Sequence, residues 1–311
     1  IFFVGDAIDF CYTKDMCFAK LKDGFERCKI GKVAYIPAER NAVTLPNIAS
    51  LKMPEYNTRS FIFDWLEVHQ KFQKKNAVDL LKLKLKYYYD ESSQKDMIVL
   101  EDGKEIGLEE ASSGLQSVVP LYVYVYYLTH WIYDHQEDIS FEKKDRIEGA
   151  LSREYIKMFS KQMNVVMDEE FLNQAVKEAK LSPGFKKILG TAKTLKKAGN
   201  DSLDNLLETV LELEENISHP HYSNIIVEEP ELNLFPETQK DLIYDLLEMI
   251  NSGRDHLLMT THSPYLLYAL NNCMLGALVQ ENIPEEEEGL QKMKDSFVKP
   301  EDVSVWEIKN G

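Results

Sequence analysis

The chain has 311 residues, of which 44% are hydrophobic and 28% charged, and its formal net charge is −16. This composition is that of a globular protein that buries one large core, and it excludes a disordered chain. No apolar run reaches the ~18 residues of a membrane span, and the acidic total gives no support for a nucleic-acid-binding surface. The four cysteines form no CxxC pair, so we expect free thiols in the cytoplasm rather than a zinc site.

The first part of the chain predicts strands around a helix. It opens on IFFV at 1–4, which is strand-like and has no initiator methionine, so we expect the true start of the protein to lie upstream. Residues 32–37 (KVAYIP) predict a strand, residues 41–57 a loop, and the apolar spacing of residues 61–80 a helix. Leucines alternate with lysines from 81 to 85, which predicts that the helix gives way to a strand there.

A hairpin and an apolar helix are expected next. Residues 97–100 and 106–108 flank Asp102-Gly103, a strong turn dipeptide, and predict two antiparallel strands. The string SSGLQ at 112–116, here named the serine motif, starts an apolar helix that runs to about Tyr127. Small residues, free N–H groups and the helix dipole favour an anion at such a start. An ordinary N-cap pair is nevertheless the usual meaning of such a string.

Residues 135–218 are charged and helical, with heptad-like apolar positions from 203 to 213, and predict a helical insertion or arm. The chain then alternates buried strands, at 224–228 and 256–261, with a helix at 236–251 and another from Pro264. This order predicts neighbouring parallel strands joined by right-handed crossovers. Ligands of such sheets bind at the carboxyl ends of the strands.

Polar residues follow both of these strands. The acidic turn, Glu228 to Glu231 (EEPE), closes the first strand, and the histidine loop, Thr261 to Ser263, closes the second. Burying a carboxylate without a cation is costly in free energy, so a magnesium ion and a polarised water are expected ligands of the acidic turn. A neutral imidazole accepts from water or donates to a phosphate oxygen. A solvated turn or a polar helix start explains each group alone, but parallel strands bring both to one crevice.

Taken together and in this order, the three motifs resemble the ABC-type ATPases. The resemblance is nearest to the OLD, RecF and SMC-like ATPases, often described as AAA-type ATP-binding proteins of bacteria. It is dense over 95–128 and 222–272 and absent across 135–218, where this family often inserts an arm. The string YIPAER at 35–40 is also similar to one seen early in this group. Arg40 within it has no firm role, a contact on the phosphate side being one option.

The resemblance implies a role for each motif. The acidic turn looks like a Walker B motif, in which Glu228 would support Mg²⁺ in place of the commoner aspartate and Glu229 would polarise the attacking water. His262 would be the switch histidine, and Asn233 would lie near the seam of a homodimer that sandwiches ATP. The serine motif looks like the signature motif, whose residues in one head touch ATP held by the other. The residues concerned are Ser112, Ser113, Gly114 and Gln116.

The sequence departs from the family in its phosphate-binding loop. No GxxxxGK[ST] string occurs in the 311 residues, and Gly5, Gly24, Gly31 and Gly103 do not fit that pattern. We therefore expect the loop to precede Ile1 or to have been lost, and the chain as given to be inactive alone.

The expected fold is α/β, a P-loop NTPase of the ABC-ATPase kind, with a parallel sheet flanked by helices, an added antiparallel hairpin and a helical insertion. Residues 1–134 and 219–311 would form the ATPase head and residues 135–218 the arm. The expected function is ATP binding and Mg²⁺-dependent hydrolysis by a cytoplasmic enzyme. It would drive a DNA-repair or phage-defence effector, with a nuclease and DNA as candidate partners and no membrane partner.

Other interpretations stay open at this point. The absent loop favours a degenerate ATPase-like scaffold or regulator without turnover. A transporter's nucleotide-binding subunit is disfavoured, because such subunits usually carry Ser-Gly-Gly and an aspartate at the metal position. Residues 303–308 (VSVWEI) predict a further strand, and a nuclease domain after Gly311 is a third option.

Overall fold

The computed structural model describes most of the chain as two compact units. The described residues are 2–4, 8–12, 17–21, 29–45, 48, 56–81, 83–135, 168–181, 218–284, 286–291 and 293–308, with scattered residues between 145 and 216. One unit comprises Ile1–Gly31 with His135–His221, and the other Lys32–Asp134 with Tyr222–Gly311. No helix in these ranges is long and apolar enough to cross a membrane.

The first unit contains a small antiparallel sheet and the described part of residues 135–218, which the sequence predicts to be a helical arm. The sheet has the order β1-β2-β3, with strands at Phe2–Val4 (β1), Ile8–Tyr12 (β2) and Cys17–Leu21 (β3). Helix α5 spans Glu169–Leu181 and is capped by Asp168, whose carboxylate accepts from the Phe171 N–H at 2.8 Å. The heptad-like positions at 203–213 that the sequence suggested lie outside the described residues.

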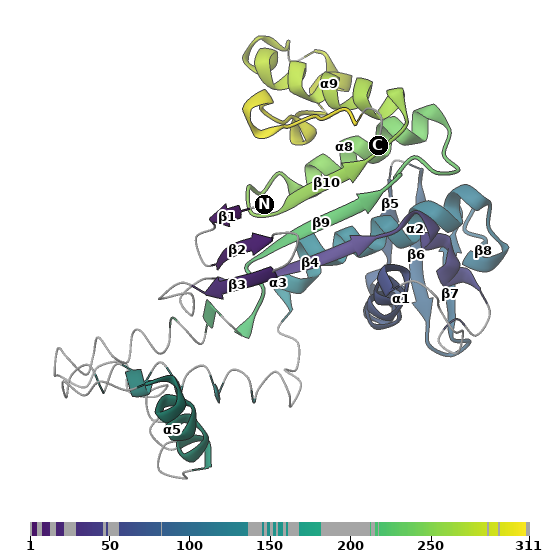
Figure 1. The fold of residues 1–311 in the computed structure, drawn as a ribbon. Helices are drawn as coiled ribbons and strands as arrows, with labels where there is room; N and C mark the ends of the chain where they lie inside the picture. Colours follow the sequence, from purple (N-terminus) through teal and green to yellow (C-terminus); the bar gives the residue numbers. More distant parts are fainter. Residues whose placement is uncertain are drawn as a thin grey trace, which may run out of the picture. The chain divides into compact units, whose positions relative to one another are not determined.

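The second unit is built on a parallel three-stranded sheet of order β10-β9-β4, as the sequence predicts (Figure 1). Its strands are Gly31–Ile36 (β4), Tyr222–Glu228 (β9) and His256–Thr260 (β10). The register pairs Glu228 of β9 with Thr260 of β10. The prediction that β10 is buried is wrong, since its side chains alternate between exposed and half-buried. Among the described strands β10 pairs with β9 alone, so it forms an edge of this sheet.

A four-stranded antiparallel sheet of order β5-β6-β7-β8 belongs to the same unit. Its strands are Val78–Leu80 (β5), Leu85–Asp90 (β6), Lys95–Val99 (β7) and Glu105–Gly107 (β8). The predicted hairpin is confirmed as β7 and β8, and Gly103 takes the left-handed conformation, at φ 81°, that its turn requires.

The helix predicted over residues 61–80 is shorter than expected. Helix α1 spans Tyr56–Val68, and Leu80 belongs to β5 instead. Asn76 fixes the non-helical segment that follows: its side chain accepts from the Gln73 N–H and donates to the Lys71 carbonyl, each at 2.8 Å. Such side-chain bonds to the backbone compete with a helix.

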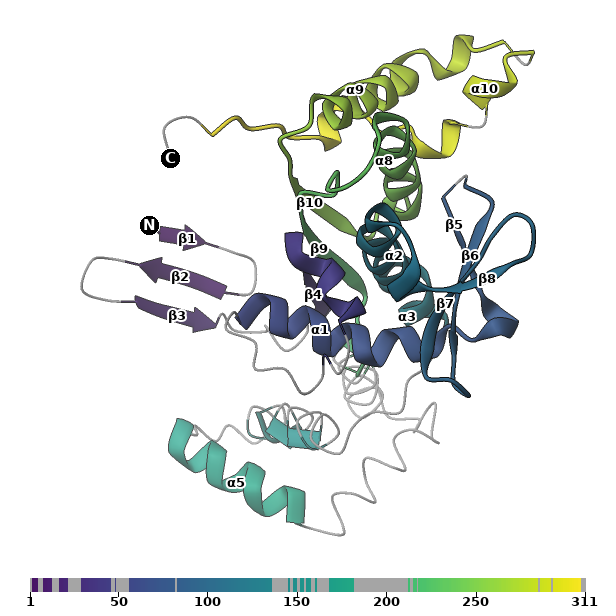
Figure 2. The ribbon, with the colours of Figure 1, turned by 90° about the vertical axis from the view of Figure 1, so that its right-hand side faces the viewer.

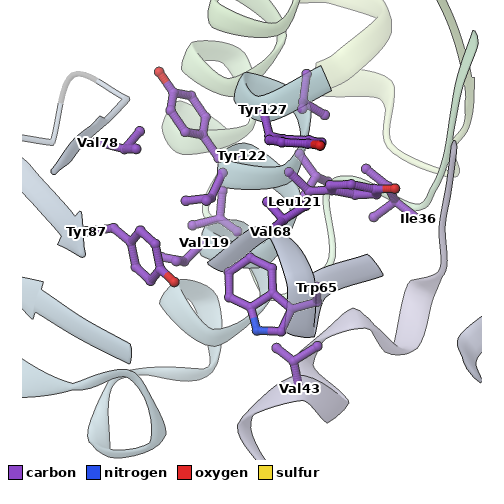
Figure 3. Packing of buried hydrophobic residues seen from close by; sticks show 14 of the residues in the cluster. Ile36, Val43, Trp65, Val68, Val78, Tyr87, Val119, Leu121, Tyr122 and Tyr127 are labelled. Carbon is purple, nitrogen blue, oxygen red and sulfur yellow. The ribbon is translucent and has the colours of Figure 1, made fainter. Parts of the chain in front are cut away.

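Helices cover one face of the central sheet. α2 (Ser113–Tyr126) and α8 (Pro236–Ile250) lie on that face, and α9 (Pro264–Val279) packs on α8 (Figure 2). The core between these elements includes Ile36, Trp65 and Leu121 (Figure 3), and each such side chain contributes roughly 1.5–3 kcal/mol on burial.

The remaining elements are short. α2 continues as a π-helical turn at Tyr127–Trp131 into α3 (Ile132–Asp134), and α10 spans Glu288–Gln291. Residues 303–308 form no strand, which corrects the prediction for them, and Trp306 is 82% exposed. A β-prone segment becomes a strand only when a neighbour pairs with it, and none of the described strands does so.

Candidate functional site

The carboxyl ends of the neighbouring parallel strands β9 and β10 lie side by side at one end of the central sheet, and the candidate site lies at this strand end. The hydrogen-bond ladder continues one residue past β9, because the Glu229 N–H donates to the Thr260 carbonyl at 2.9 Å. Glu229 then takes a left-handed backbone conformation, with φ 41°. For a residue with a side chain such a conformation costs roughly 1–3 kcal/mol, and these conformations cluster at functional sites. The chain therefore turns sharply at Glu229.

Glu229 and His262 approach each other at the carboxyl ends of these two strands. The His262 Nε2 lies 3.9 Å from the Glu229 Oε1, and the two side chains are 89% and 36% exposed. A pair so open to solvent contributes little to stability, but both groups are accessible to a ligand. The structure thus brings together the two side chains that the sequence analysis paired. Their catalytic roles stay predictions.

Arg40 connects three segments near the carboxyl end of β9, namely its own turn after β4, helix α2 and the acidic turn. Its side chain is 0% exposed. Its guanidinium donates to the carbonyl oxygens of Ser117 (2.9 Å), Pro37 (3.3 Å), Glu228 (2.9 Å), Glu229 (3.0 Å) and Pro230 (3.2 Å). An arginine has five N–H donors, and these bonds use all of them.

The same geometry corrects the phosphate-side option for Arg40, since no donor is left and the side chain does not reach the surface. Burial lowers the pKa of Arg40 to about 10, and Glu231 gives the largest of the opposing effects. The guanidinium is therefore charged at neutral pH, and its role here is to hold the backbone on both sides of Glu229.

Glu228 faces Tyr35 of the neighbouring strand β4. Burial and a hydrogen bond to the Glu228 carboxylate raise the pKa of Tyr35 to about 12. A carboxylate offers about four acceptor positions, so Tyr35 leaves room for another partner. Among the described residues, no group of three His, Cys, Asp or Glu side chains could hold a metal ion. A single carboxylate nevertheless fits Mg²⁺, which usually takes one or two and completes its shell with water and phosphate oxygens.

The serine motif lies at the start of α2, as predicted. Ser112 is the N-cap, and its Oγ accepts from the Leu115 N–H at 3.4 Å. Ser112 and Ser113 are both exposed. The Gln116 amide is occupied locally, donating to the Glu109 and Ala111 carbonyls at 3.0 and 3.1 Å. The N-cap explanation therefore holds for Ser112, and the serines alone offer free surface.

Gly114 and Asn233 mark a close approach between the serine motif and the loop after the acidic turn. A Cβ on Gly114 would lie 2.9 Å from the Asn233 carbonyl oxygen. Asn233 is exposed and left-handed, with φ 63°. The side chain of Gln239 in α8 extends the connection, because it donates to the Leu234 carbonyl at 2.8 Å and accepts from the Ser263 hydroxyl at 2.6 Å. The three motifs are therefore linked within one unit.

The contacts that Tyr35, Arg40 and Glu231 make here were not predicted from the sequence. Glu231 Oε1 accepts from the Thr261 hydroxyl and from the His262 N–H, each at 2.8 Å. The YIPAER string was a signal for the first two residues, although it did not reveal their partners. For Glu231, no sequence signal shows that its side chain turns toward the histidine loop.

These features define an α/β fold with carboxylates and an imidazole at the carboxyl ends of parallel strands, the place where nucleotide-binding sheets hold their ligands. Residues 132–267 match the family model of an AAA ATPase domain. That stretch contains the acidic turn and the histidine loop and begins after the serine motif. No curated protein matches the chain. The match supports an AAA-like ATPase, with ATP binding and hydrolysis as its general activity.

Proposed function

We propose that the protein hydrolyses ATP with Glu229 as the group that activates water and His262 as a contact to the terminal phosphate. The observation that carries the proposal is the 3.9 Å approach of these two side chains at the ends of adjacent parallel strands. Phosphoryl transfer requires positioning and charge stabilisation more than covalent chemistry. A carboxylate beside an imidazole supplies an acceptor for the water and a donor for the phosphate.

Glu228 would hold Mg²⁺, which neutralises charge on the phosphates when bound. Ser112 and Ser113, with the backbone of Gly114, would contact ATP held by a second copy of the chain, and Asn233 would lie near the seam of that dimer. Gln116, whose amide is already bound to the Glu109 and Ala111 carbonyls, would hold the start of α2 in place. The exposure of both serines at the start of a 14-residue helix supports this, because free N–H groups there attract an anion. ATP would thereby close a homodimer, and hydrolysis would reopen it.

The test is Glu229→Gln in the complete protein, with Glu237→Gln, an exposed residue of α8, as the matched control. Glu229→Gln should keep ATP binding, lower turnover by about 100-fold or more and accumulate an ATP-bound dimer on size exclusion. Turnover equal to that of the control variant would refute the role of Glu229. A wild-type protein that binds ATP without turnover would instead support the alternative, a degenerate ATPase-like scaffold or regulator.

We further propose that hydrolysis drives a DNA-repair or phage-defence effector with a nuclease partner. Four lysines on or beside the four-stranded antiparallel sheet are paired with acids, which disfavours this sheet as a DNA surface: Lys74 with Glu105, Lys84 with Glu101, Lys86 with Asp79 and Lys95 with Glu109. DNA would therefore be held elsewhere, by the arm or the partner. ATPase rates with and without duplex DNA, at low and high salt, test this, and rates unchanged by DNA would contradict it.

A further inference from the structure

The histidine loop is held in place by one carboxylate from the acidic turn. Glu231 Oε1 accepts from the Thr261 hydroxyl and from the His262 backbone N–H, each at 2.8 Å. The Thr261 hydroxyl oxygen in turn accepts from the Ser263 N–H at 2.9 Å. One oxygen of Glu231 thus organises the whole loop that carries the imidazole.

The other carboxylate oxygen of Glu231 has different surroundings. Oε2 is buried and accepts no hydrogen bond from any residue that the structure describes. A buried polar atom without a partner is costly, and such atoms in native proteins call for a functional or electrostatic explanation. The positive charge of the buried Arg40 provides an electrostatic explanation. Burial lowers the pKa of Arg40, and among the charges that raise it again the Glu231 carboxylate has the largest effect.

These contacts make Glu231 a link between the two strand ends. Arg40 holds the carbonyls of Glu228, Glu229 and Pro230, and Glu231 holds the loop of His262. The position of the imidazole relative to the Glu229 carboxylate therefore depends on Glu231, although Glu231 need not touch the nucleotide.

We propose that Glu231 is a positioning residue that sets the His262 loop against Glu229. The proposal rests on the ATPase function proposed above. A displacement of about 1 Å in a reacting group lowers a rate by about 100-fold, so the expected effect is on kcat. ATP affinity should change little, because Glu231 acts through the histidine loop and need not touch the nucleotide.

The test compares Glu231→Ala, Glu231→Gln and the exposed control Glu237→Gln in the complete protein. For Glu231→Ala we expect a fall in kcat of about tenfold or more with KM within about threefold of wild type. Glu231→Gln keeps the volume and one acceptor oxygen, so its kcat should lie between those of wild type and Glu231→Ala. Equal kcat for wild type and Glu231→Ala, or a loss confined to KM, would overturn the proposal.

Amide hydrogen exchange at His262 tests the loop contact without any turnover. The His262 N–H loses its acceptor in Glu231→Ala, so its exchange should become about tenfold faster under conditions where the variant is fully folded, while Glu231→Gln stays near wild type. Unchanged exchange in Glu231→Ala would overturn the proposal. If wild type shows no ATP turnover but the exchange responds, the proposed function fails and the positioning contact stands. Should Glu231→Ala not fold, Glu231→Gln decides by its kcat relative to Glu237→Gln.

Discussion

Replacing Arg40 by lysine removes part of the hydrogen bonding that holds the acidic turn. The lysine ammonium has three donors against the five of arginine, so at least two of the five carbonyls now bound lose their partner. Each buried group left without a partner costs roughly 1–3 kcal/mol, which gives a loss of about 2–6 kcal/mol. That is a large share of the ~5–15 kcal/mol by which a typical domain is stable.

Urea unfolding followed by tryptophan fluorescence measures this loss, because Trp65 lies in the core of the same unit at 1% exposure. The midpoint should fall at an unchanged slope. Arg59→Lys is the control: Arg59 is exposed, with its guanidinium 5.4 Å from the centroid of the Phe63 ring, and its change should stay within about 0.5 kcal/mol. A loss for Arg40→Lys no larger than that of Arg59→Lys would show that the carbonyl cluster is not held as described.

Three further changes test the site and the sheet that carries it. Gly114→Ala brings a Cβ within 2.9 Å of the Asn233 carbonyl and should cost about 1–3 kcal/mol in thermal unfolding, whereas Gly289→Ala, with nothing within 4 Å, should be neutral. Asp255, just before β10, is buried, and its carboxylate accepts from the Tyr133 hydroxyl at 2.6 Å and from the Ser223 N–H at 2.7 Å. Asp255→Ala should therefore cost about 3 kcal/mol or more in urea unfolding. A cost below about 1 kcal/mol would contradict these contacts. The folded-state pKa of Tyr35 is raised to about 12 from 10.0, so the unfolded chain releases this proton first and the free energy of unfolding falls as pH rises from 10 to about 12. Tyr35→Phe should lose less stability over this pH range. Parallel plots of unfolding free energy against pH for the two proteins would refute the raised pKa.

Part of the candidate site was predictable because the signals are local. The apolar run of β9, the start of α8 at Pro236 and the strand at β10 are periodic patterns within single segments. Two strands joined by one helix are parallel and neighbouring in most folds, so residues that follow them share an edge. Glu229 and His262 are therefore expected to lie together from the sequence alone.

Other features could not be predicted because they depend on segments far apart in the chain. Arg40 bonds the Glu228 carbonyl across 188 residues and the Ser117 carbonyl across 77. A sequence shows that an arginine is present, but not which carbonyls surround it once the chain has packed. The phosphate contact considered for Arg40 failed for that reason, and the burial predicted for β10 failed because a strand's exposure depends on its neighbours in the sheet.

The sequence by itself determined the strand–helix–strand–helix order of residues 222–279 and the residue types at the strand ends, since periodicity and turn chemistry act over a few residues. Only the tertiary structure decided how those ends are held: a buried arginine saturated by carbonyls, and Glu231 turned back onto the histidine loop. The physical reason is that a hydrogen bond requires its two partners within about 3 Å of each other, and such distances between remote residues exist only after folding.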